Sequence, residues 1–178
     1  MSGMKNLLRK LTDTSNGGKN LPWITRKVMA FISGYDHEKY WRRRNFVVTP
    51  NNGVNLLLKI YYLLWIKRVD RKHYCSFGTS YNTGAQFVTP PYLPHGPNGI
   101  IVGSDAKIGA NVTLYHQVTI PAGGVQIGDY TTLFPGAKVI EGVKIGANCR
   151  IGANAVVCED IPDGATVVPQ RARIILKK

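Results

Sequence analysis

The sequence of 178 residues has few acidic side chains, few cysteines and no long apolar run. Its longest strongly apolar stretch, Val54 to Ile66, covers 13 residues and includes Lys59, so it is too short to span a bilayer. Three cysteines without metal-type spacing argue against a disulfide framework and fit a reducing compartment. The first twenty residues lack an apolar core of secretory length, so we expect no signal peptide and a cytoplasmic protein.

Apolar residues make up 44% of the chain, which suits one compact domain with an extension. Only 19% of the residues are charged and aromatic residues are well represented, so a wholly disordered chain is excluded. The chain has 19 glycines and 10 prolines, which exclude a long helical bundle and require many turns.

The positive charge is concentrated at the start of the chain. Residues 1–72 contain 15 basic and 4 acidic residues, a net charge of +11, whereas residues 73–178 contain 8 and 6, a net charge of +2. This asymmetry has two interpretations: a solvated basic set of helices, or a surface for an anionic partner such as a lipid membrane or an acidic polymer.

From residue 102 the chain repeats every six residues, with one step of seven between Ile120 and Ile127. A second series lies two residues before each member of the first. The large members are Val102, Ile108, Leu114, Ile120, Ile127, Leu133, Val139, Ile145, Ile151 and Val157. The second series is Ile100, Ala106, Val112, Val118, Val125, Thr131, Ala137, Val143, Cys149 and Ala155.

Two inward residues separated by one outward residue form a short strand. A glycine often follows the large member, as at Gly103 and Gly128, where it fits a corner that a Cβ would crowd. Three such sides close one coil, and each coil bonds to the next, so a single repeat is not stable alone. The period predicts a mainly β fold, a parallel β-helix, in which residues 102–157 supply about three coils.

Two places break the period. The extra residue falls in a small loop, Pro121 to Gly124. The period continues weakly backwards through Cys75, Tyr81, Phe87 and Leu93, and then breaks at the segment Leu93-Pro94-His95-Gly96-Pro97-Asn98-Gly99. Since irregular loops on a rigid scaffold commonly carry function, this segment is the first place to look for chemistry.

The six-residue repeat resembles the hexapeptide-repeat acyltransferases, whose fold is a left-handed parallel β-helix. The segment Leu93 to Gly103, followed by Ala106-Lys107-Ile108-Gly109 and Val118-Thr119-Ile120, resembles the serine acetyltransferase branch. That branch includes serine acetyltransferases and O-acetyltransferases of capsule and lipopolysaccharide synthesis. The resemblance covers roughly residues 80–176 and implies a homotrimer that uses acetyl-CoA.

By this resemblance His95 matches the catalytic histidine of the branch. An acceptor hydroxyl needs a base near neutral pKa to attack a thioester, and an imidazole meets that need. His116 is a corner residue that can lie on a neighbouring level of the same face or meet His95 across a subunit boundary, with an acceptor-binding role, a second catalytic role or none. His37 and His73 lie in basic, non-repeating sequence and are interpreted as surface histidines.

The chain departs from the branch near His95. Ser80 stands where the branch has an aspartate, and Pro94 stands where it has an acidic residue before the histidine. The missing acids favour a neutral sugar hydroxyl, in cell-surface polysaccharide synthesis, over serine, whose ammonium group they would meet. A serine O-acetyltransferase is the alternative. The partner that orients His95 stays open, with candidates Tyr81, Asn82, Asp105 or a backbone carbonyl.

The resemblance also implies a coenzyme groove between subunits, where backbone groups bond the pantetheine arm and basic residues meet the phosphates. Ala153 sits at a corner that can offer its N–H, whereas Pro135, one coil earlier, cannot donate. The candidate phosphate partners are Lys138, Arg171, Arg173, Lys177 and Lys178.

We divide the chain into a basic, mainly helical extension, residues 1–72, and a β-helix acyltransferase domain with a short C-terminal tail, residues 73–178. We expect a short helix over 5–11 and a helix over roughly 54–68 capped by Asn51 or Asn52. The second helix either covers the open edge of the first coil or joins the aromatic and basic residues on an anionic membrane surface.

Three other functional classes would also fit parts of the sequence. A zinc carbonic anhydrase on a β-helix needs three converging histidines, and the repeat offers only His95 and His116, so we expect no metal. Nucleic-acid binding would rest on charge alone, and we expect no such partner. A non-catalytic glycan-binding protein remains an alternative, and it predicts no release of CoA with any acceptor.

Overall fold

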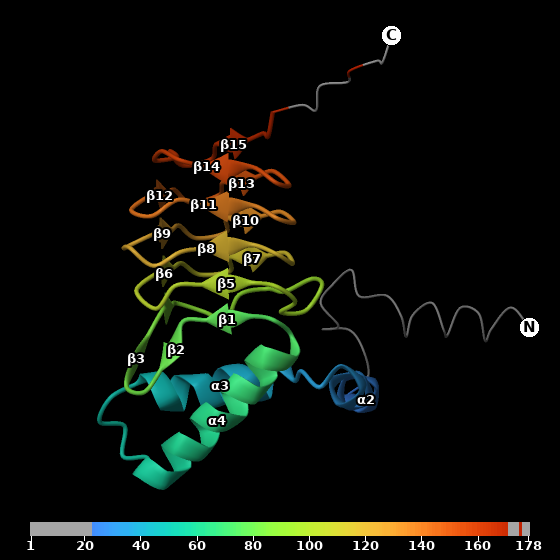
Figure 1. The fold of residues 1–178 in the computed structure, drawn as a ribbon, viewed down its shortest axis with the longest axis vertical. Coiled ribbons are helices and arrows are strands. Elements are labelled where there is room, and N and C mark those ends of the chain that lie inside the picture. Colours follow the sequence, from blue (N-terminus) through green and yellow to red (C-terminus); the bar gives the residue numbers. More distant parts are fainter. Residues whose placement is uncertain (1–22, 171–174, 176–178) are drawn as a thin grey trace, which may run out of the picture.

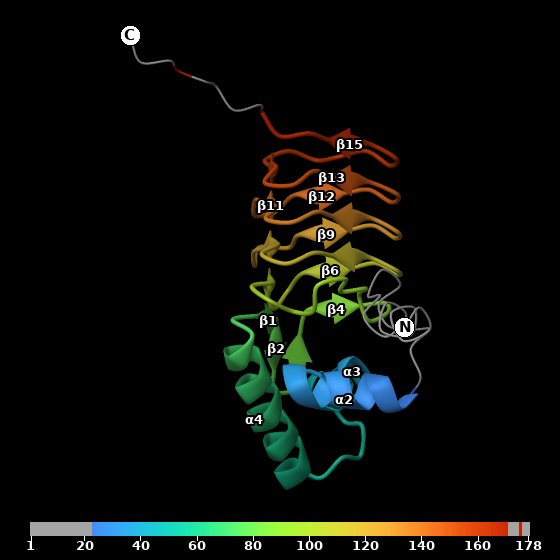
Figure 2. The same ribbon diagram turned by 90° about the vertical axis from the view of Figure 1, so that its right-hand side faces the viewer.

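The structure, a computed structural model, describes residues 23–170 and residue 175. In these residues three helices precede a tall stack of two-residue strands, and the helices and β15 lie at opposite ends of the long axis (Figures 1 and 2). The expected helix over 5–11 and the candidates Arg171, Arg173, Lys177 and Lys178 lie outside the described residues. The helices are α2 (Trp23–Ser33), α3 (His37–Val48) and α4 (Leu56–Lys72).

The strands form three parallel sheets, which the chain visits in turn as it coils. The β5 face contains β1 (Ser76–Phe77), β5 (Ile101–Val102), β8 (Thr119–Ile120), β11 (Lys138–Val139) and β14 (Val156–Val157). The β7 face contains β7 (Thr113–Leu114), β10 (Thr132–Leu133), β13 (Arg150–Ile151) and β15 (Thr166–Val167). The β6 face contains β4 (Gln86–Phe87), β6 (Lys107–Ile108), β9 (Gln126–Ile127) and β12 (Lys144–Ile145).

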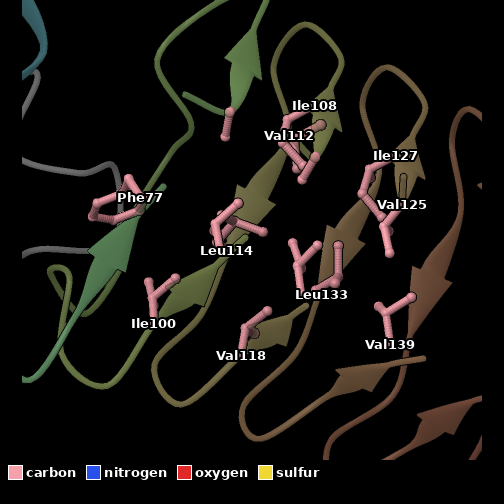
Figure 3. Packing of buried hydrophobic residues seen from close by; sticks show 14 of the residues in the cluster. Phe77, Ile100, Ile108, Val112, Leu114, Val118, Val125, Ile127, Leu133 and Val139 are labelled. Atoms are coloured by element: carbon pink, nitrogen blue, oxygen red, sulfur yellow. The ribbon is translucent and has the colours of Figure 1, made fainter. Parts of the chain in front are cut away.

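The predicted β-helix is confirmed, and its longest stack of strands begins before the regular repeat, at β1. Equivalent residues pair from coil to coil, as Leu114, Leu133 and Ile151 do on the β7 face. Every member of both predicted series is buried, and their side chains fill the centre of the coils (Figure 3). The structure is consistent with the left-handed form that the resemblance implies.

The corners use two kinds of residue. Left-handed backbone falls just before the small inward residues, with the exception of Ala106, for example at Asn111 (φ 54°) and Asn154 (φ 59°). The glycines after the large inward residues serve another purpose. A Cβ on Gly128 would lie 2.5 Å from the backbone N of Ala147 in the next coil, so the coils can approach only because that Cβ is absent.

Helix α3 covers the open end of the β-helix with a buried cation. Arg44 is only 4% exposed and donates to the carbonyls of Phe77 (2.9 Å) and Ala85 (2.6 Å) and to Oγ1 of Thr79 (3.1 Å). Burial lowers the pKa of Arg44 to about 10. The guanidinium thereby satisfies backbone carbonyls that have no coil below them to bond with.

Helix α4 starts later than the helix expected over roughly 54–68. Its N-cap is Asn55, whose Oδ1 accepts the N–H of Leu57, rather than Asn51 or Asn52. Lys59 of this helix points inward: it is 4% exposed and donates to the Thr49 carbonyl and to Asn82 Oδ1, both at 2.8 Å. The apolar residues of its first half therefore face outward.

The weak backward continuation of the period is wrong at Tyr81. That residue is exposed at the turn of an antiparallel hairpin between β2 (Thr79–Ser80) and β3 (Thr83–Gly84). Phe77, which the period did not select, is fully buried on β1 and packs edge-on against Trp41 of α3, with ring centroids 5.2 Å apart. The first coil is thus closed by aromatic contacts to a helix rather than by another repeat.

Candidate active site

Two histidines from separate coils meet at one corner of the β-helix. His95 lies in the irregular segment between β4 and β5, and its side chain is exposed. His116 lies in the corner between β7 and β8 and is half-buried. Their Nδ1 atoms are 2.8 Å apart within one chain.

The contact is a hydrogen bond between ring edges. The ring centroids are 4.9 Å apart and the ring planes differ by 29°, so the two nitrogens are far closer than the centroids, as an N–H···N bond in the ring plane requires. One Nδ1 carries the proton and the other accepts it. The bond leaves Nε2 of His95 free, and the exposed ring can present it to a substrate.

Aromatic rings line the same edge. Tyr115 meets His95 edge-on at 5.3 Å, and Phe134 stacks on Tyr115 at 5.4 Å from the next coil. The guanidinium of Arg150 lies 5.1 Å from the Phe134 ring centroid. The histidine pair therefore sits at the end of an apolar and cationic column that follows the long axis.

Two of the residues expected to orient His95, Asn82 and Asp105, are engaged elsewhere. Asn82 accepts from Lys59. The Asp105 carboxylate accepts the N–H groups of Gly123 and Gly124, and these bonds hold the pKa of Asp105 below its usual value of 3.8. In the described part of the chain neither residue has a side-chain contact with His95, whereas Nδ1 of His116 lies within hydrogen-bond distance of it.

Two of the predicted coenzyme residues lie near this corner. Pairing of Leu114, Leu133 and Ile151 places His116, Pro135 and Ala153 in one column, two coils apart from end to end, or about 10 Å. Ala153 is exposed, and its N–H makes no backbone hydrogen bond within the described residues. Lys138 is exposed on β11, and its Nζ donates to the Gly136 carbonyl at 3.1 Å.

A hollow of about 700 Å³ lies on another side of the molecule. It covers the β6 face and is lined by Lys107, Gln126, Lys144 and Asp160 among others. The chain passes from the β6 face to the β7 face and then to the histidine corner, so the hollow and the histidines lie across the prism from each other.

Sequence reasoning interpreted His73 as a surface histidine and did not select Asn98. In the structure His73 is half-buried at the end of α4, and its Nδ1 lies 3.0 Å from Oδ1 of Asn98, inside the His95 segment. Neither residue belongs to a repeat, so periodicity gave no signal for them.

Among the described residues, no helix has the length and apolar content that crossing a bilayer requires. The same part of the chain contains no cluster of three or more side chains suited to hold a metal ion.

The fold and repeat define the class as the hexapeptide-repeat transferases. The family described as "Bacterial transferase hexapeptide (six repeats)" matches residues 124–159, and "Hexapeptide repeat of succinyl-transferase" matches residues 96–116.

The similar proteins with curated names are serine acetyltransferases. A serine acetyltransferase of Helicobacter pylori strain J99 is 36% identical over 107 residues, which are 56% of this chain and 62% of that protein. One of Mycobacterium tuberculosis is 35% identical over 105 residues, 55% of this chain and 45% of that protein. The chain thus matches about half to three fifths of the length of these relatives.

Solved structures share the fold. Native serine acetyltransferase 1 of Entamoeba histolytica has a TM-score of 0.61 at 21% identity, over 90% of this chain and 62% of that one. A serine acetyltransferase in complex with CoA has a TM-score of 0.57 at 21% identity, over 72% of this chain and 50% of that one. Together, the family matches, the relatives and the fold support a hexapeptide-repeat acyltransferase of the serine acetyltransferase-like branch.

Proposed function

We propose that the chain is an acetyl-CoA-dependent O-acetyltransferase in which His95 is the general base. The hydrogen bond between His95 and His116 carries this proposal, because it holds an exposed imidazole in one orientation with Nε2 free. The acceptor hydroxyl attacks the thioester carbonyl as its proton passes to Nε2 of His95. The carbon–sulfur bond then breaks, and the CoA sulfur takes that proton from His95.

His116 acts on His95 through the shared proton. When His95 becomes positively charged, its Nδ1–H donates to the Nδ1 lone pair of His116, which stabilises the charge. This is the role that a carboxylate has in other acid–base pairs, here taken by a neutral ring. Because a doubly charged pair would place two N–H groups face to face, we expect the pair to hold a single positive charge during turnover.

The acceptor that the relatives support best is serine, the substrate in their names, and this revises the sugar hydroxyl expected from the sequence. A sugar hydroxyl in cell-surface polysaccharide synthesis is the second candidate. It is favoured by the neutral surroundings of His95, whose contacts in the described residues are His116, Tyr115 and Asn98 rather than a carboxylate that would bind an ammonium group.

Thiol release from acetyl-CoA tests the function directly. Purified protein is assayed with serine, with free sugars and with oligosaccharides, and the acetylated product is identified by mass spectrometry. Turnover with serine supports the first acceptor, and turnover restricted to sugars supports the second. A protein that releases no CoA with any acceptor is a binding protein, and the proposal is then wrong.

We propose that the donor follows the column from His116 to Ala153, where the Ala153 N–H can bond the pantetheine arm. Lys138 lies on the adjoining strand, and it can meet a phosphate if its Nζ leaves the Gly136 carbonyl. Arg173 and Lys177 are further phosphate candidates on the tail. Replacement of Lys138 by Ala is expected to raise the KM for acetyl-CoA about three- to tenfold with little change in kcat.

We further propose a homotrimer. The hollow on the β6 face lies across the prism from the histidines, so one chain cannot offer both to one substrate. A neighbouring copy can place its own β6 face against the histidine corner. Sedimentation equilibrium should give three times the chain mass. A monomer with full activity would contradict this proposal.

The division at residue 72 is also a proposal: the basic extension is a membrane-contact region and residues 73–178 carry the chemistry. On α4, Leu57, Tyr61, Leu64, Arg68 and Arg71 follow a spacing of four and three residues, so they share one face, and all five are exposed. The apolar end of α4 is the part of the molecule farthest from β15 (Figure 1).

An anionic lipid surface at the inner face of the membrane fits this face of α4. Exposed leucines can enter the interface, and each nearby Lys or Arg contributes about 1 kcal/mol toward anionic lipid. Pairing of this face with a second copy would bring together two regions of net charge +11.

We expect the wild-type protein to sediment with vesicles of phosphatidylcholine and phosphatidylglycerol at low salt. High salt and the double variant Leu57→Ser, Leu64→Ser should each abolish this cosedimentation. The exposed strand residue Val156→Ser is the control. A double variant that still sediments, or one that changes only the oligomeric state, would refute membrane contact.

A further inference from the structure

The end of α4 is bonded directly to the segment that carries His95. His73 is the C-cap of α4, and its carbonyl accepts the N–H of Gly99 at 3.0 Å. Its Nδ1 lies 3.0 Å from Oδ1 of Asn98. One residue of the helical region therefore contacts two residues of the active-site segment.

Asn98 in turn contacts the backbone beside both histidines of the pair. Its Nδ2 donates to the His95 carbonyl at 3.0 Å. Its own carbonyl accepts the N–H of Gln117, the residue after His116, at 3.0 Å. Asn98 is thus the common neighbour of three segments: the helix end, the His95 loop and the His116 corner.

The bonds of Asn98 fix the proton on His73. Because the amide Nδ2 donates to a carbonyl, Oδ1 is the atom that faces His73, and an oxygen there requires a proton on His73 Nδ1. Nε2 of His73 is buried without a hydrogen-bond partner in the described residues. Within the described residues, the bond to Asn98 is therefore the only hydrogen bond of the His73 ring. It connects the end of α4 to the active-site segment.

We infer that His73 and Asn98 are positioning residues for His95, a role that rests on the proposed function. Asn98 holds the His95 carbonyl and the N–H of the corner residue Gln117 at fixed separation, and this keeps the two Nδ1 atoms within hydrogen-bond reach. His73 in turn holds the side chain of Asn98 through its Oδ1. A displacement of about 1 Å at a reacting group can lower a rate about 100-fold, so loss of this support is expected in kcat.

Steady-state kinetics of four variants and one control variant test the inference. Asn98→Ala is expected to lower kcat about 10- to 100-fold while the KM values stay within about threefold. His73→Ala is expected to lower kcat about three- to tenfold, and the double variant should be no slower than Asn98→Ala alone, because His73 acts through Asn98. His73→Asn keeps an N–H at the same distance from the backbone and should restore kcat to within about threefold of wild type. Lys72→Ala, an exposed change on the same turn of α4, is the control.

If the kcat losses of the two single variants multiply in the double variant, the inference is wrong. It is also wrong if Asn98→Ala keeps the wild-type kcat. Asn98→Asp is the variant of choice if the alanine changes unfold the protein, since it keeps an acceptor for His73 and replaces the donor to the His95 carbonyl by a carboxylate oxygen. Its kcat should also fall.

Nitrogen NMR of the imidazoles gives a readout that needs no acceptor. In wild type His95 should show one tautomer, and in Asn98→Asp a mixture of two; an unchanged spectrum would contradict the positioning role. Absence of acyl transfer by the wild type with every acceptor would refute the proposed function, whereas the NMR comparison would still decide the positioning role.

Discussion

The coils between Ile100 and Val157 and the segment before them, residues 73–99, are stabilised in different ways. In the coils each buried side chain has an equivalent one coil away, and backbone bonds repeat with the same register. In residues 73–99 the main contacts occur once each: Phe77 on Trp41, Arg44 on two carbonyls, and Asn98 between three segments. The candidate chemistry lies where the irregular segment meets the first regular corner.

This difference indicates that the regular coils provide rigidity, whereas the irregular segment provides the unique site. A stack of identical coils supplies a rigid edge, but identical corners cannot create a unique site. The His95 loop breaks the repeat and lies against a corner that the repeat holds in place. The position of the His95 ring is therefore defined by one irregular loop that lies on the regular coils.

The irregular end is the part we expect to be most sensitive to a single substitution. Arg44→Met removes the donor to the carbonyls of Phe77 and Ala85 and leaves both buried without a partner. The free energy of unfolding should fall by about 3–5 kcal/mol. Arg42→Met, an exposed change on the same helix, should stay within about 0.5 kcal/mol. Urea unfolding of both variants measures the contrast, and equal stabilities would contradict the capping role of Arg44.

A core substitution in the coils tests the regular side of the comparison. Leu133→Ala deletes a fully buried side chain between Leu114 and Ile151, and the tight stacking of the coils limits collapse into the cavity. We expect a loss of about 3 kcal/mol. Lys144→Ala, at an exposed outward position, should change stability by less than about 0.5 kcal/mol. A similar loss at both positions would show that the inward series does not carry the stability of the coils.

The regular half could be predicted from the sequence because its contacts are periodic. Once the phase of the series was fixed, each residue from Ile100 to Val157 had a defined side, and the extra residue between Ile120 and Ile127 had to form a loop. The same reasoning failed at Tyr81, where a hairpin replaces a side of the coil.

The contacts that define the site were not visible in the sequence. His95 and His116 are 21 residues apart, and the period alone left open whether they meet in one chain or across a subunit boundary. His73 and Asn98 are 25 residues apart and have no equivalents in other coils. Such single long-range hydrogen bonds follow from how the chain closes at one end, which no local pattern records.

The smallest expected effect concerns pH and the loop at Pro121 to Gly124. The N–H of Gly123 and then that of Gly124 hold the pKa of the Asp105 carboxyl below its unfolded value. The folded-state pKa is lowered, so this stabilisation is complete above the unfolded pKa of about 4 and is lost as the pH falls through the folded value. Amide NMR shifts of Gly123 and Gly124 should titrate in acid in wild type. The variant Asp105→Asn should lack that titration, and persistence of the titration there would assign it to another group.

The central claim is that one imidazole at the junction of the irregular and regular regions performs base catalysis. The most direct measurement is the kcat of His95→Ala with acetyl-CoA and the acceptor identified by thiol release, together with a binding titration of CoA. We predict a fall in kcat of about 100- to 10,000-fold with unchanged CoA affinity. A variant that turns over at the wild-type rate would contradict the account.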